Sequence, residues 1–562
     1  MHLTSTSQIP KAETCSEIDQ SVQRRTANYK PNIWKYDLLQ SLTSKFSEEQ
    51  YSRKAERLKE DVTRMYVCTN DLISKLELID SISNLGLSNY FEEEIKEELD
   101  AIGFPENSRS NTKRDLYATS LWFRLLRQYG YNPPQDIFLE YLDKNGKFMS
   151  SSDSNAKGML ELFQASNLST EGENILKEAR SFSVKHLRRV SVNSSNKFGK
   201  QIDHALSLPL HWKGEWYDIR KYIHDHDTEN KTNSVLVELA KLNFNIVQAA
   251  HQEDLKDLSR WWISLGITEK MSFVRDRLAE SFLYAVGIAF EPQYGSLRKW
   301  LSKVITLILI VDDVYDIYGS LEELECFSNA VERWKPEEIN ELPECMKTCF
   351  WALYNTTKEI AAEIQKEKGL TSVLPYLQKA WADFCNSLLV EAKWYNEGYT
   401  PSLKEYLDNG WMSSSGPLLA LHVILGIANQ TTKDISEFLK DNRDLVYCTS
   451  LIIRLCNDQG TSAAELERGD ASSSILCYMR EANVSEEVAR EHVRNIIVET
   501  WEKINSHCMS ATGTFPQEPV IKHIVNTGRA AHFTYQNGDG FGVQDLETRE
   551  QILSSLIEPL AL

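Results

Sequence analysis

An apolar segment near the middle of the chain ends in three closely spaced aspartates. The stretch LILIVDDVYDIYG runs from Leu307 to Gly319 and carries Asp312, Asp313 and Asp316. Carboxylates at this spacing repel one another, and burying them without a cationic partner is costly. Asp312 and Asp316 are four residues apart and share a helix face, whereas Asp313 is rotated away from it. We therefore expect positive charge beside this helix end.

A second group of oxygen donors lies downstream, in the stretch LIIRLCNDQGTSAAELERGD. Asn457, Thr461 and Glu465 recur every four residues, which places them on one stripe over two helical turns. Carboxylate, amide and hydroxyl oxygens without His or Cys are hard ligands, typical of sites for Mg²⁺ or Mn²⁺. Two facing helices with these side chains could hold such metal ions on the oxygens of a diphosphate.

Three arginines are candidates for the anion-binding part of the site. Arg454 lies one turn before Asn457 in an otherwise apolar run, and we see no acidic partner adjacent in the sequence. A buried guanidinium needs an anion. Upstream, SFVRDRLAES supplies Arg275 and Arg277, which could face the same anion. Each motif has an ordinary alternative as a solvated helix end, a chance pair or a surface stripe, but their ordered occurrence in one half favours a metal–diphosphate site.

The elements that position these residues are predicted to be helices. Of the 562 residues 42% are hydrophobic, and they recur at helical spacing, while 24 glycines and 15 prolines leave few turns. We find no series of alternating strands, so the fold class is all-α. A net charge of −19 argues against a nucleic-acid surface. The ten cysteines form no CxxC pair, which favours a reduced intracellular protein, and no apolar run reaches membrane-spanning length.

The chain divides into three predicted parts. Residues 1–23 are Ser/Thr-bearing and include acidic residues, without the arginine enrichment of a transit peptide or the apolar core of a secretory signal. We expect them to be a disordered lead and the protein to be cytoplasmic. The longest polar stretch, IHDHDTENKTNS, places a domain boundary near residue 230, between an N-terminal domain of residues 24–230 and a C-terminal domain of residues 231–562.

Taken together, these motifs resemble those of plant class I terpene synthases. DDVYD resembles the family's DDxxD motif, NDQGTSAAE its second metal motif and RDR its RxR motif. RRTANYKPNIW, with Arg24, Arg25 and Trp34, resembles the plant RRx8W motif. The resemblance runs from Arg24 to the C-terminus and is strongest to angiosperm-type synthases of acyclic products.

The resemblance implies two helical domains, of which the C-terminal α-bundle is catalytic. The N-terminal barrel-like domain has no DxDD motif, so it is expected to be catalytically silent. The N-terminal arm with Arg24, Arg25 and Trp34 is expected to fold across the mouth of the active site, in a structural or a chemical role. A monomer is expected.

The resemblance also implies a role for each site residue. Asp312 and Asp316 are expected to bind two Mg²⁺ ions, with Mn²⁺ as an alternative, and Asn457, Thr461 and Glu465 a third. Arg275 and Arg454 are expected to hold the diphosphate, with Arg277 in support. The rings expected to face the carbocation, for which core packing is the ordinary alternative, are Tyr284, Tyr535 and Phe541. WMSSSGP, residues 411–417, matches the broken pocket helix whose carbonyls face the cation.

The expected reaction is ionisation of farnesyl diphosphate and deprotonation to an acyclic sesquiterpene, (E,E)-α-farnesene. The alternatives within this class are geranyl diphosphate as substrate, with β-ocimene or linalool as product, and the alcohol nerolidol. A chain-elongating prenyltransferase would need a second DDxxD motif, and the chain has NDQGTSAAE in that place. A non-catalytic helical scaffold is the alternative of a different class, and it predicts no release of diphosphate from any prenyl substrate.

Overall fold

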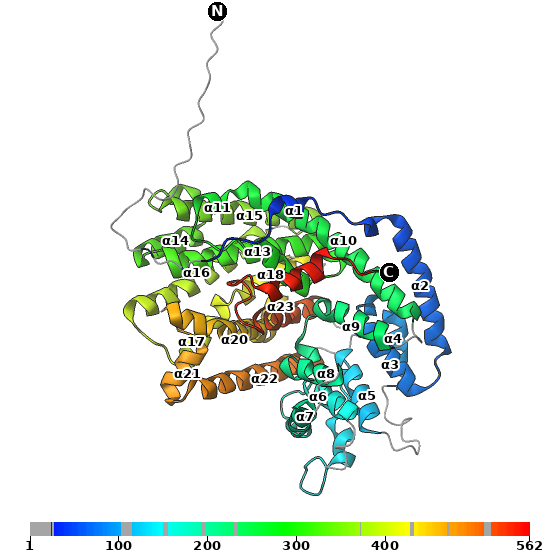
Figure 1. The fold of residues 1–562 in the computed structure, drawn as a ribbon. Helices are drawn as coiled ribbons and strands as arrows, with labels where there is room; N and C mark the ends of the chain where they lie inside the picture. Colours follow the sequence, from blue (N-terminus) through cyan, green and yellow to red (C-terminus); the bar gives the residue numbers. More distant parts are fainter. Residues whose placement is uncertain are drawn as a thin grey trace, which may run out of the picture.

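The computed structural model describes most of the chain (Figure 1). The described residues are 24, 27, 29–102, 115–149, 156–192, 197–229, 234–370, 372–427, 432–468, 472–510 and 519–562. Within helices, the side chains of residues 228, 229, 432–434 and 464–468 are outside the description. The predicted lead of residues 1–23 lies outside the described residues, and so does the predicted boundary at residue 230.

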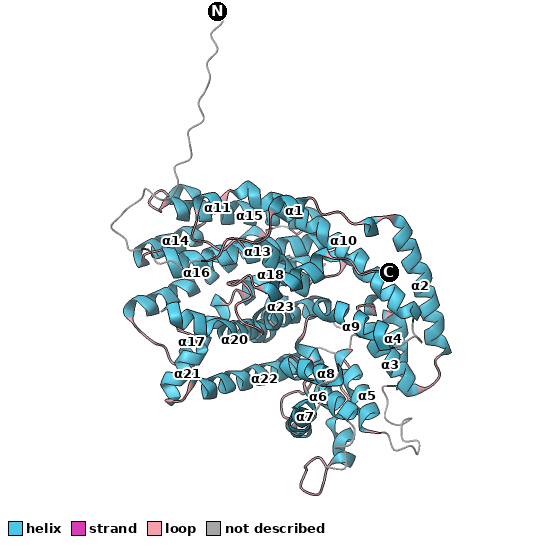
Figure 2. Ribbon diagram, viewed as in Figure 1, coloured by secondary structure: helices cyan, strands magenta, loops and turns pink. Residues whose placement is uncertain are grey.

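The described part of the chain is helical throughout, as Figure 2 shows, apart from one antiparallel bridge between Leu142 and Phe148. The first half contains α1 (Tyr36–Gln40), α2 (Glu49–Cys68), α3 (Leu72–Asn84), α4 (Glu92–Ile102), α5 (Leu116–Gln128), α6 (Ala156–Ser166), α7 (Asn174–Val192), α8 (Lys197–Ser207) and α9 (Glu215–Glu229). This confirms the all-α fold class.

The second half is built from longer helices. Its elements are α10 (Ser234–Leu265), α11 (Ile267–Lys270), α12 (Leu278–Ile288), α13 (Gly295–Asp313), α14 (Leu321–Arg333), α15 (Glu344–Lys368), α16 (Leu374–Glu397), α17 (Leu403–Ser413), α18 (Gly416–Ile427), α19 (Thr432–Asp441), α20 (Arg443–Arg468), α21 (Ser474–Ala482), α22 (Glu486–Ser510), α23 (Pro519–Tyr535) and α24 (Leu546–Ile552). Short 3₁₀ and π turns join several of them.

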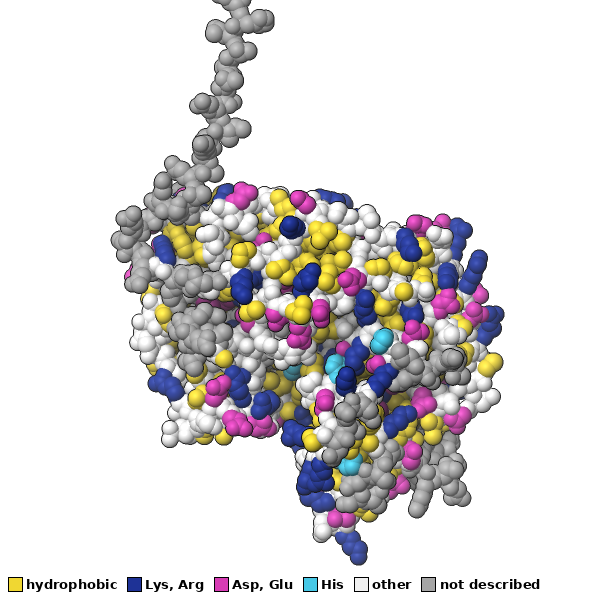
Figure 3. All heavy atoms as spheres, viewed as in Figure 1, with side chains coloured by type: hydrophobic (Ala, Val, Ile, Leu, Met, Phe, Trp, Pro, Cys, Tyr) yellow, Lys and Arg dark blue, Asp and Glu magenta, His cyan; other side chains and the backbone are white. Residues whose placement is uncertain are grey.

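Helical periodicity explains why these segments pack as they do. In α2 the buried side chains are Ala55, Leu58, Val62 and Tyr66, a single stripe at helical spacing. By contrast α13 is buried on nearly every side, as its continuous apolar sequence predicts for a central helix. On the face in Figure 3, acidic and basic side chains are interspersed over both halves, with apolar side chains between them. Charged stripes thus face solvent while apolar stripes form the core.

One apolar stretch is longer than the sequence analysis recognised. Leu403–Ile427, which comprises α17 and α18, is the one stretch in the described residues that is long and apolar enough to cross a membrane. The prediction considered only uninterrupted apolar runs, and so it missed a stretch that includes polar residues. Because 83% of its apolar window is buried inside the fold, the stretch has the environment of core helices, which pass the same test of length and composition.

The first described residues and the C-terminal residues both lie on the C-terminal half (Figure 1). The described residues between Arg24 and Lys35, here called the strap, lead into α1, which packs on α10. The C-terminal residues also lie on α10, where three carboxamides, Asn245, Gln248 and Gln252, donate hydrogen bonds to backbone carbonyls of residues 554–560. The two ends therefore flank the same long helix.

Candidate active site

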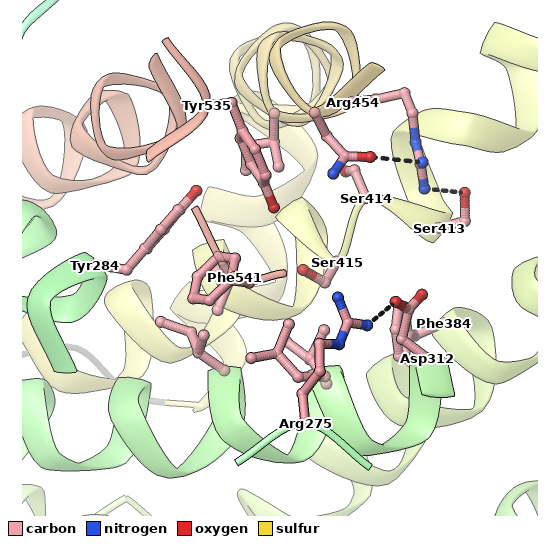
Figure 4. Close-up of a pocket in the computed structure, with 16 residues that line it drawn as sticks. Arg275, Tyr284, Asp312, Phe384, Ser413, Ser414, Ser415, Arg454, Tyr535 and Phe541 are labelled. Atoms are coloured by element: carbon pink, nitrogen blue, oxygen red, sulfur yellow. Dashed lines mark hydrogen bonds and ion pairs between the residues drawn. The ribbon is translucent and has the colours of Figure 1, made fainter. Parts of the chain in front are cut away.

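A cavity in the C-terminal half brings the two oxygen-rich motifs together (Figure 4). It encloses about 650 Å³ of empty space, its open mouth included. Its polar lining consists of Arg275, Asp312, Ser413, Ser414, Ser415, Arg454 and Asn457. Its apolar and aromatic lining consists of Tyr284, Ile305, Ile308, Leu309, Phe384, Leu419, Ile453, Tyr535 and Phe541. A charged end thus adjoins an apolar chamber.

The floor of the chamber was recognisable in the sequence but was not predicted. Ile305, Ile308, Leu309 and Asp312 all line the cavity from α13. Their spacing is that of one helix face, so the stripe that leads to the first aspartate of the motif is also the apolar wall of the site. The signal was present in the helical period, but the sequence analysis identified α13 only as an enclosed helix.

The C-terminal end of α13 places its three aspartates in different environments. Asp312 lines the cavity and Asp313 is fully buried. Asp316 is exposed, and it lies in a π-helical turn, Val314–Tyr318, outside the cavity lining. Such single π turns within helices are frequent at functional sites. The turn closes at Ser320, which begins α14 with a capping box.

Arg275 supplies the positive charge expected beside the aspartates at the end of α13. Its Nη2 lies 2.5 Å from Asp312 Oδ2, and its Nε lies 3.0 Å from Asp313 Oδ1. Its backbone N–H donates to Asp313 Oδ2 at 2.7 Å. Burial raises the pKa of Asp313 to about 6, although the neighbouring Arg275 opposes this rise. The same carboxylates hold the pKa of Arg275 well above its usual range against the effect of burial.

Arg454 approaches the cavity from α20. Its guanidinium donates to Ser413 Oγ at 3.0 Å, to Asn457 Oδ1 at 3.3 Å and to the Gly410 carbonyl at 3.4 Å. Arg454 also forms an ion pair with Asp458, whose Oδ1 lies 3.7 Å from Nη1. The expectation that no acidic partner is adjacent in the sequence is therefore wrong, because Asp458 lies one helical turn further along α20.

Two carboxylates behind Arg454, the buried Asp458 and the half-buried Glu391, were missed from the sequence. Asp458 accepts hydrogen bonds from the Tyr406 hydroxyl at 2.9 Å and from the Ser474 backbone N–H at 2.8 Å. Glu391, on α16, accepts hydrogen bonds from the Ser413 hydroxyl and from Asn409 Nδ2. Burial raises the pKa of Glu391, and Arg454 opposes this rise. Because α16 and α17 supply these contacts, only the tertiary structure could reveal them.

The second metal motif is only partly within the described residues. Asn457 lines the cavity, and Thr461 is buried one turn further on, where its hydroxyl donates to the Asn457 carbonyl at 2.9 Å. The side chain of Glu465 lies outside the described residues, so its predicted role stays a prediction. Arg25 of the N-terminal arm also lies outside the described residues, so its predicted role stays a prediction.

Arg277 does not line the cavity, which corrects the prediction that it faces the same anion as Arg275. It is fully buried, and it donates to the backbone carbonyls of Lys30, Asp276, Phe541 and Gly542. Four carbonyls already take its donors, so a direct contact with a diphosphate would require these bonds to break. Its position supports the site indirectly, because it ties the strap to the loop that carries Phe541.

The three predicted aromatic residues all line the chamber. The ring of Phe541 lies between the two tyrosines, with its centroid 6.0 Å from that of Tyr284 and 6.1 Å from that of Tyr535. The Tyr284 hydroxyl donates to the Thr527 carbonyl at 3.0 Å, which links α12 to α23. Figure 4 shows the three side chains grouped on the side of the cavity away from Asp312.

The predicted break in the pocket helix lies between α17 and α18. Ser415 has a φ of 63°, the left-handed region that side chains rarely adopt. A Cβ on the next residue, Gly416, would overlap the side chain of Ser450, so only glycine fits there. The Ser415 carbonyl accepts from the Leu419 N–H at 3.0 Å, so this carbonyl is already engaged within the fold. The hydroxyl-bearing residues 413–415 line the cavity.

The strap lies beside the charged end of the cavity, where it contacts Tyr318, Glu323 and Arg275. Arg24 forms a bidentate ion pair with Glu323, at 2.5 and 2.8 Å, and also donates to the Tyr318 carbonyl at 2.7 Å. The guanidinium of Arg275 lies 5.2 Å from the centroid of the Tyr29 ring. Trp34 is buried, and its indole N–H donates to Glu280 at 3.3 Å.

The donor set of the cavity fits Mg²⁺. Among the described residues no three His, Cys, Asp or Glu side chains converge on a ready-made metal site. The donors that face the cavity are the carboxylate of Asp312 and the carboxamide of Asn457. Mg²⁺ typically takes one or two protein oxygens and completes its octahedron with water and phosphate oxygens. An all-oxygen set without His or Cys is therefore suited to this ion once a phosphate is present.

Comparisons with known proteins assign both halves of the chain. Residues 263–503 match the model of the metal binding domain of the terpene synthase family, and residues 33–206 match that of the terpene synthase N-terminal domain. An alpha-farnesene synthase from Ricinus communis is 50% identical over 545 residues, which cover 96% of each chain. An (E,E)-alpha-farnesene synthase from Malus domestica is also 50% identical, over 96% of this chain and 94% of the relative.

Solved structures give the same assignment. A crystal structure of limonene synthase with 2-fluorolinalyl diphosphate is 38% identical and has a TM-score of 0.91, over 96% of this chain and 100% of the other. A crystal structure of isoprene synthase from grey poplar (Populus x canescens), in complex with three Mg²⁺ ions and dimethylallyl-S-thiolodiphosphate, is 42% identical with a TM-score of 0.86. It covers 94% of this chain and 99% of that structure. The predicted fold of two helical domains is confirmed, while the exact boundary near residue 230 stays a prediction.

Proposed function

The chain belongs to the terpene synthase family, and from this premise we propose that it converts farnesyl diphosphate to (E,E)-α-farnesene and diphosphate. It is a class I enzyme, a carbon–oxygen lyase that acts on phosphates. The observation that carries the proposal is the cavity itself, where Arg275 with Asp312 and Arg454 with Asn457 form the charged end of an apolar, aromatic chamber. The proposed substrate has the same two parts.

The charged end would bind the diphosphate. The guanidiniums of Arg275 and Arg454 are fixed by their contacts with Asp312 and Asn457, and both present donors to the cavity. We propose that Asp312, Asp316, Asn457, Thr461 and Glu465 hold three Mg²⁺ ions there. When bound, these ions would stabilise the negative charge that develops on the departing diphosphate. The two arginines would add charge-assisted hydrogen bonds to the same oxygens.

The apolar end would hold the hydrocarbon chain and protect the carbocation. Ile305, Ile308 and Leu309 present only hydrocarbon to the cavity, so water has little to bind there. The rings of Tyr284, Tyr535 and Phe541 could stabilise positive charge through their electron-rich faces. Heterolysis of the allylic carbon–oxygen bond leaves a cation and diphosphate, and loss of one proton from the cation adds a fourth double bond and gives the tetraene. The departing diphosphate is the base that we propose.

Product analysis tests this function directly. Purified protein is incubated with Mg²⁺ and, in separate reactions, with farnesyl, geranyl or dimethylallyl diphosphate, and volatiles and released diphosphate are measured. We expect (E,E)-α-farnesene from farnesyl diphosphate as the main product. Turnover of geranyl diphosphate alone, to β-ocimene or linalool, or nerolidol as the main product would contradict the proposal. No diphosphate release from any substrate would favour the scaffold alternative.

We also propose that the enzyme acts as a monomer in the cytoplasm. Relatives named as chloroplastic, such as gamma-terpinene synthase from Citrus limon at 44% identity, make plastids the alternative. Imaging a fluorescent fusion of the full chain would decide between the two, and light scattering of the purified protein would give its mass in solution.

A further inference from the structure

The N-terminal half inserts one aromatic side chain between the two helices that carry the chamber tyrosines. Tyr217 lies on α9, within the predicted N-terminal domain and between the two family-model matches. Its ring stacks on that of Phe533 in α23, with centroids 3.6 Å apart and planes 6° from parallel. Its hydroxyl donates to the Leu283 carbonyl in α12 at 3.2 Å. The side chain thus contacts both helices.

A glycine in α12 leaves the space that this hydroxyl occupies. A Cβ on Gly287 would overlap both the Oη and the ring of Tyr217, so any other residue there would displace the tyrosine. A Cβ on Gly214 would lie 2.9 Å from Tyr217 Cε2, which is also closer than real Cβ contacts. The fit therefore depends on two glycines in different parts of the chain.

The contacts of Tyr217 are next to the chamber lining. Leu283, whose carbonyl accepts the hydroxyl, directly precedes Tyr284, and Phe533 lies two residues before Tyr535. Tyr284 and Tyr535 line the cavity, and the Tyr284 hydroxyl bonds to α23. A shift of α12 against α23 would therefore move both rings relative to each other. Side chains in packed interiors transmit such shifts, because there is little free volume to absorb them.

We propose that Tyr217 is a positioning residue, which sets the separation of α12 and α23 and thereby the shape of the aromatic wall of the chamber. This inference rests on the proposed function, since the wall acts on the carbocation. It gives the N-terminal half a part in determining the product, although none of the described residues of that half lines the cavity. The contact acts through Tyr284 and Tyr535 and does not reach the substrate.

Three variants test the proposal. Tyr217→Phe keeps the stacked ring, so we expect kcat, KM and products to stay within about twofold of the wild type. Tyr217→Ala removes the side chain that contacts both helices. We expect kcat to fall about tenfold or more, because small misplacements of reacting groups slow the reaction strongly. Its KM should change less than about threefold, since the diphosphate contacts are elsewhere, and its product composition should shift. Tyr222→Ala, on the same helix, is the control.

Among the described residues, Tyr222 makes no hydrogen bond or ring contact with α12 or α23, so its loss should leave the products unchanged. Amide hydrogen exchange, which needs no substrate, should rise in α12 and α23 of Tyr217→Ala and remain unchanged in α20. Unchanged exchange and products in Tyr217→Ala, or equal changes in the control, would overturn the proposal. If Tyr217→Ala does not fold, Tyr217→Leu replaces it in every measurement. If the wild type turns over no substrate, the proposed function is refuted. Amide hydrogen exchange would still test whether Tyr217 holds α12 and α23 in place.

Discussion

At the scale of single residues, the arrangement of charge around Arg275 explains why the chain tolerates three neighbouring aspartates. Asp313 is buried and pairs with the backbone and side chain of Arg275, whereas Asp312 faces the cavity and shares the same guanidinium. One guanidinium thus pairs with two of the three carboxylates. Asp312 therefore reaches the cavity in a fixed position, since its partner is itself held by the buried Asp313.

Replacing Asp312 should test the role of its carboxylate in the reaction. We expect Asp312→Ala to lower kcat/KM about 100-fold or more, because removing a preorganised group that stabilises developing charge costs about 10²–10³ in rate. Released diphosphate under steady-state conditions is the measurement. Asp408→Asn, which changes an exposed carboxylate paired with Lys404, is the matched control and should behave as the wild type. Equal activity in both variants would contradict the role of Asp312.

The same scale shows what spacing could and could not predict. The chamber aromatics were expected from the resemblance alone. Spacing, by contrast, indicated the helix faces that carry Asp312 and Asn457 to the cavity, because a helix period of 3.6 fixes which side chains share a face. It failed for Arg277, which ends the extended segment before α12 and turns its side chain towards backbone carbonyls. It also missed Glu391, because a partner contributed by another helix leaves no local signal.

At the scale of elements, the ion pair between Arg24 and Glu323 helps to hold the strap in place, and its contribution to stability depends on pH. Glu323 pairs with Arg24 and also accepts the Ser320 N–H of the capping box. Although burial alone would raise its pKa, these hydrogen bonds lower the pKa of Glu323 below its ordinary value of 4.5. A lowered pKa in the folded state means that the stabilisation is fully present above about pH 4.5 and is lost as pH falls through the folded pKa.

Glu323→Gln should therefore reduce stability only where the carboxylate is ionised. We expect its unfolding midpoint to lie below that of the wild type by a constant amount from pH 7 to about pH 5, and this difference should shrink below about pH 4.5. Thermal unfolding of both proteins across this range is the measurement. Glu332→Gln, at an exposed position of α14, controls for general charge effects. A difference that stays constant down to about pH 3.5 would be the contrary result.

The elements themselves were the most predictable part of the fold. Apolar residues at helical spacing and the scarcity of glycine and proline predict an all-α chain, and α13 was recognised as central from its composition alone. What the pattern could not predict is the fit between distant elements. The contact of Tyr217 with Gly287 depends on an absent side chain, and the absence of a Cβ has no periodic signal.

At the scale of the whole molecule, segments that are far apart in the sequence form the site and its surroundings. The cavity lining comes from residues between Arg275 and Phe541, and the strap adds contacts from the first described residues. Binding at the cavity should therefore stabilise the molecule as a whole. A ligand that binds only the folded state adds RT ln(1 + [L]/Kd), about 2.7 kcal/mol when its concentration is 100 times Kd.

Inorganic diphosphate and Mg²⁺ together should thus raise the unfolding midpoint by more than the sum of their separate effects, because the donor set is completed only when both are present. Thermal unfolding with each component alone and with both is the measurement. Asp312→Ala should lose this synergy, and chelation with EDTA should abolish product formation until Mg²⁺ is restored. An identical diphosphate shift in EDTA would show that the anion binds without a divalent ion.

The meeting of the two chain ends has a consequence for biosynthesis. Gln544 receives the Ile33 N–H at 2.9 Å and donates to Asn32, across more than 500 residues of sequence, and Leu560 exchanges two hydrogen bonds with Asn245. These contacts cannot form while the last residues are still inside the ribosomal exit tunnel. Domains that emerge first generally fold as units during translation. The strap can therefore be held over the chamber only after these C-terminal residues have left the tunnel, and a chain truncated before Gln544 would lack the contacts that hold it there.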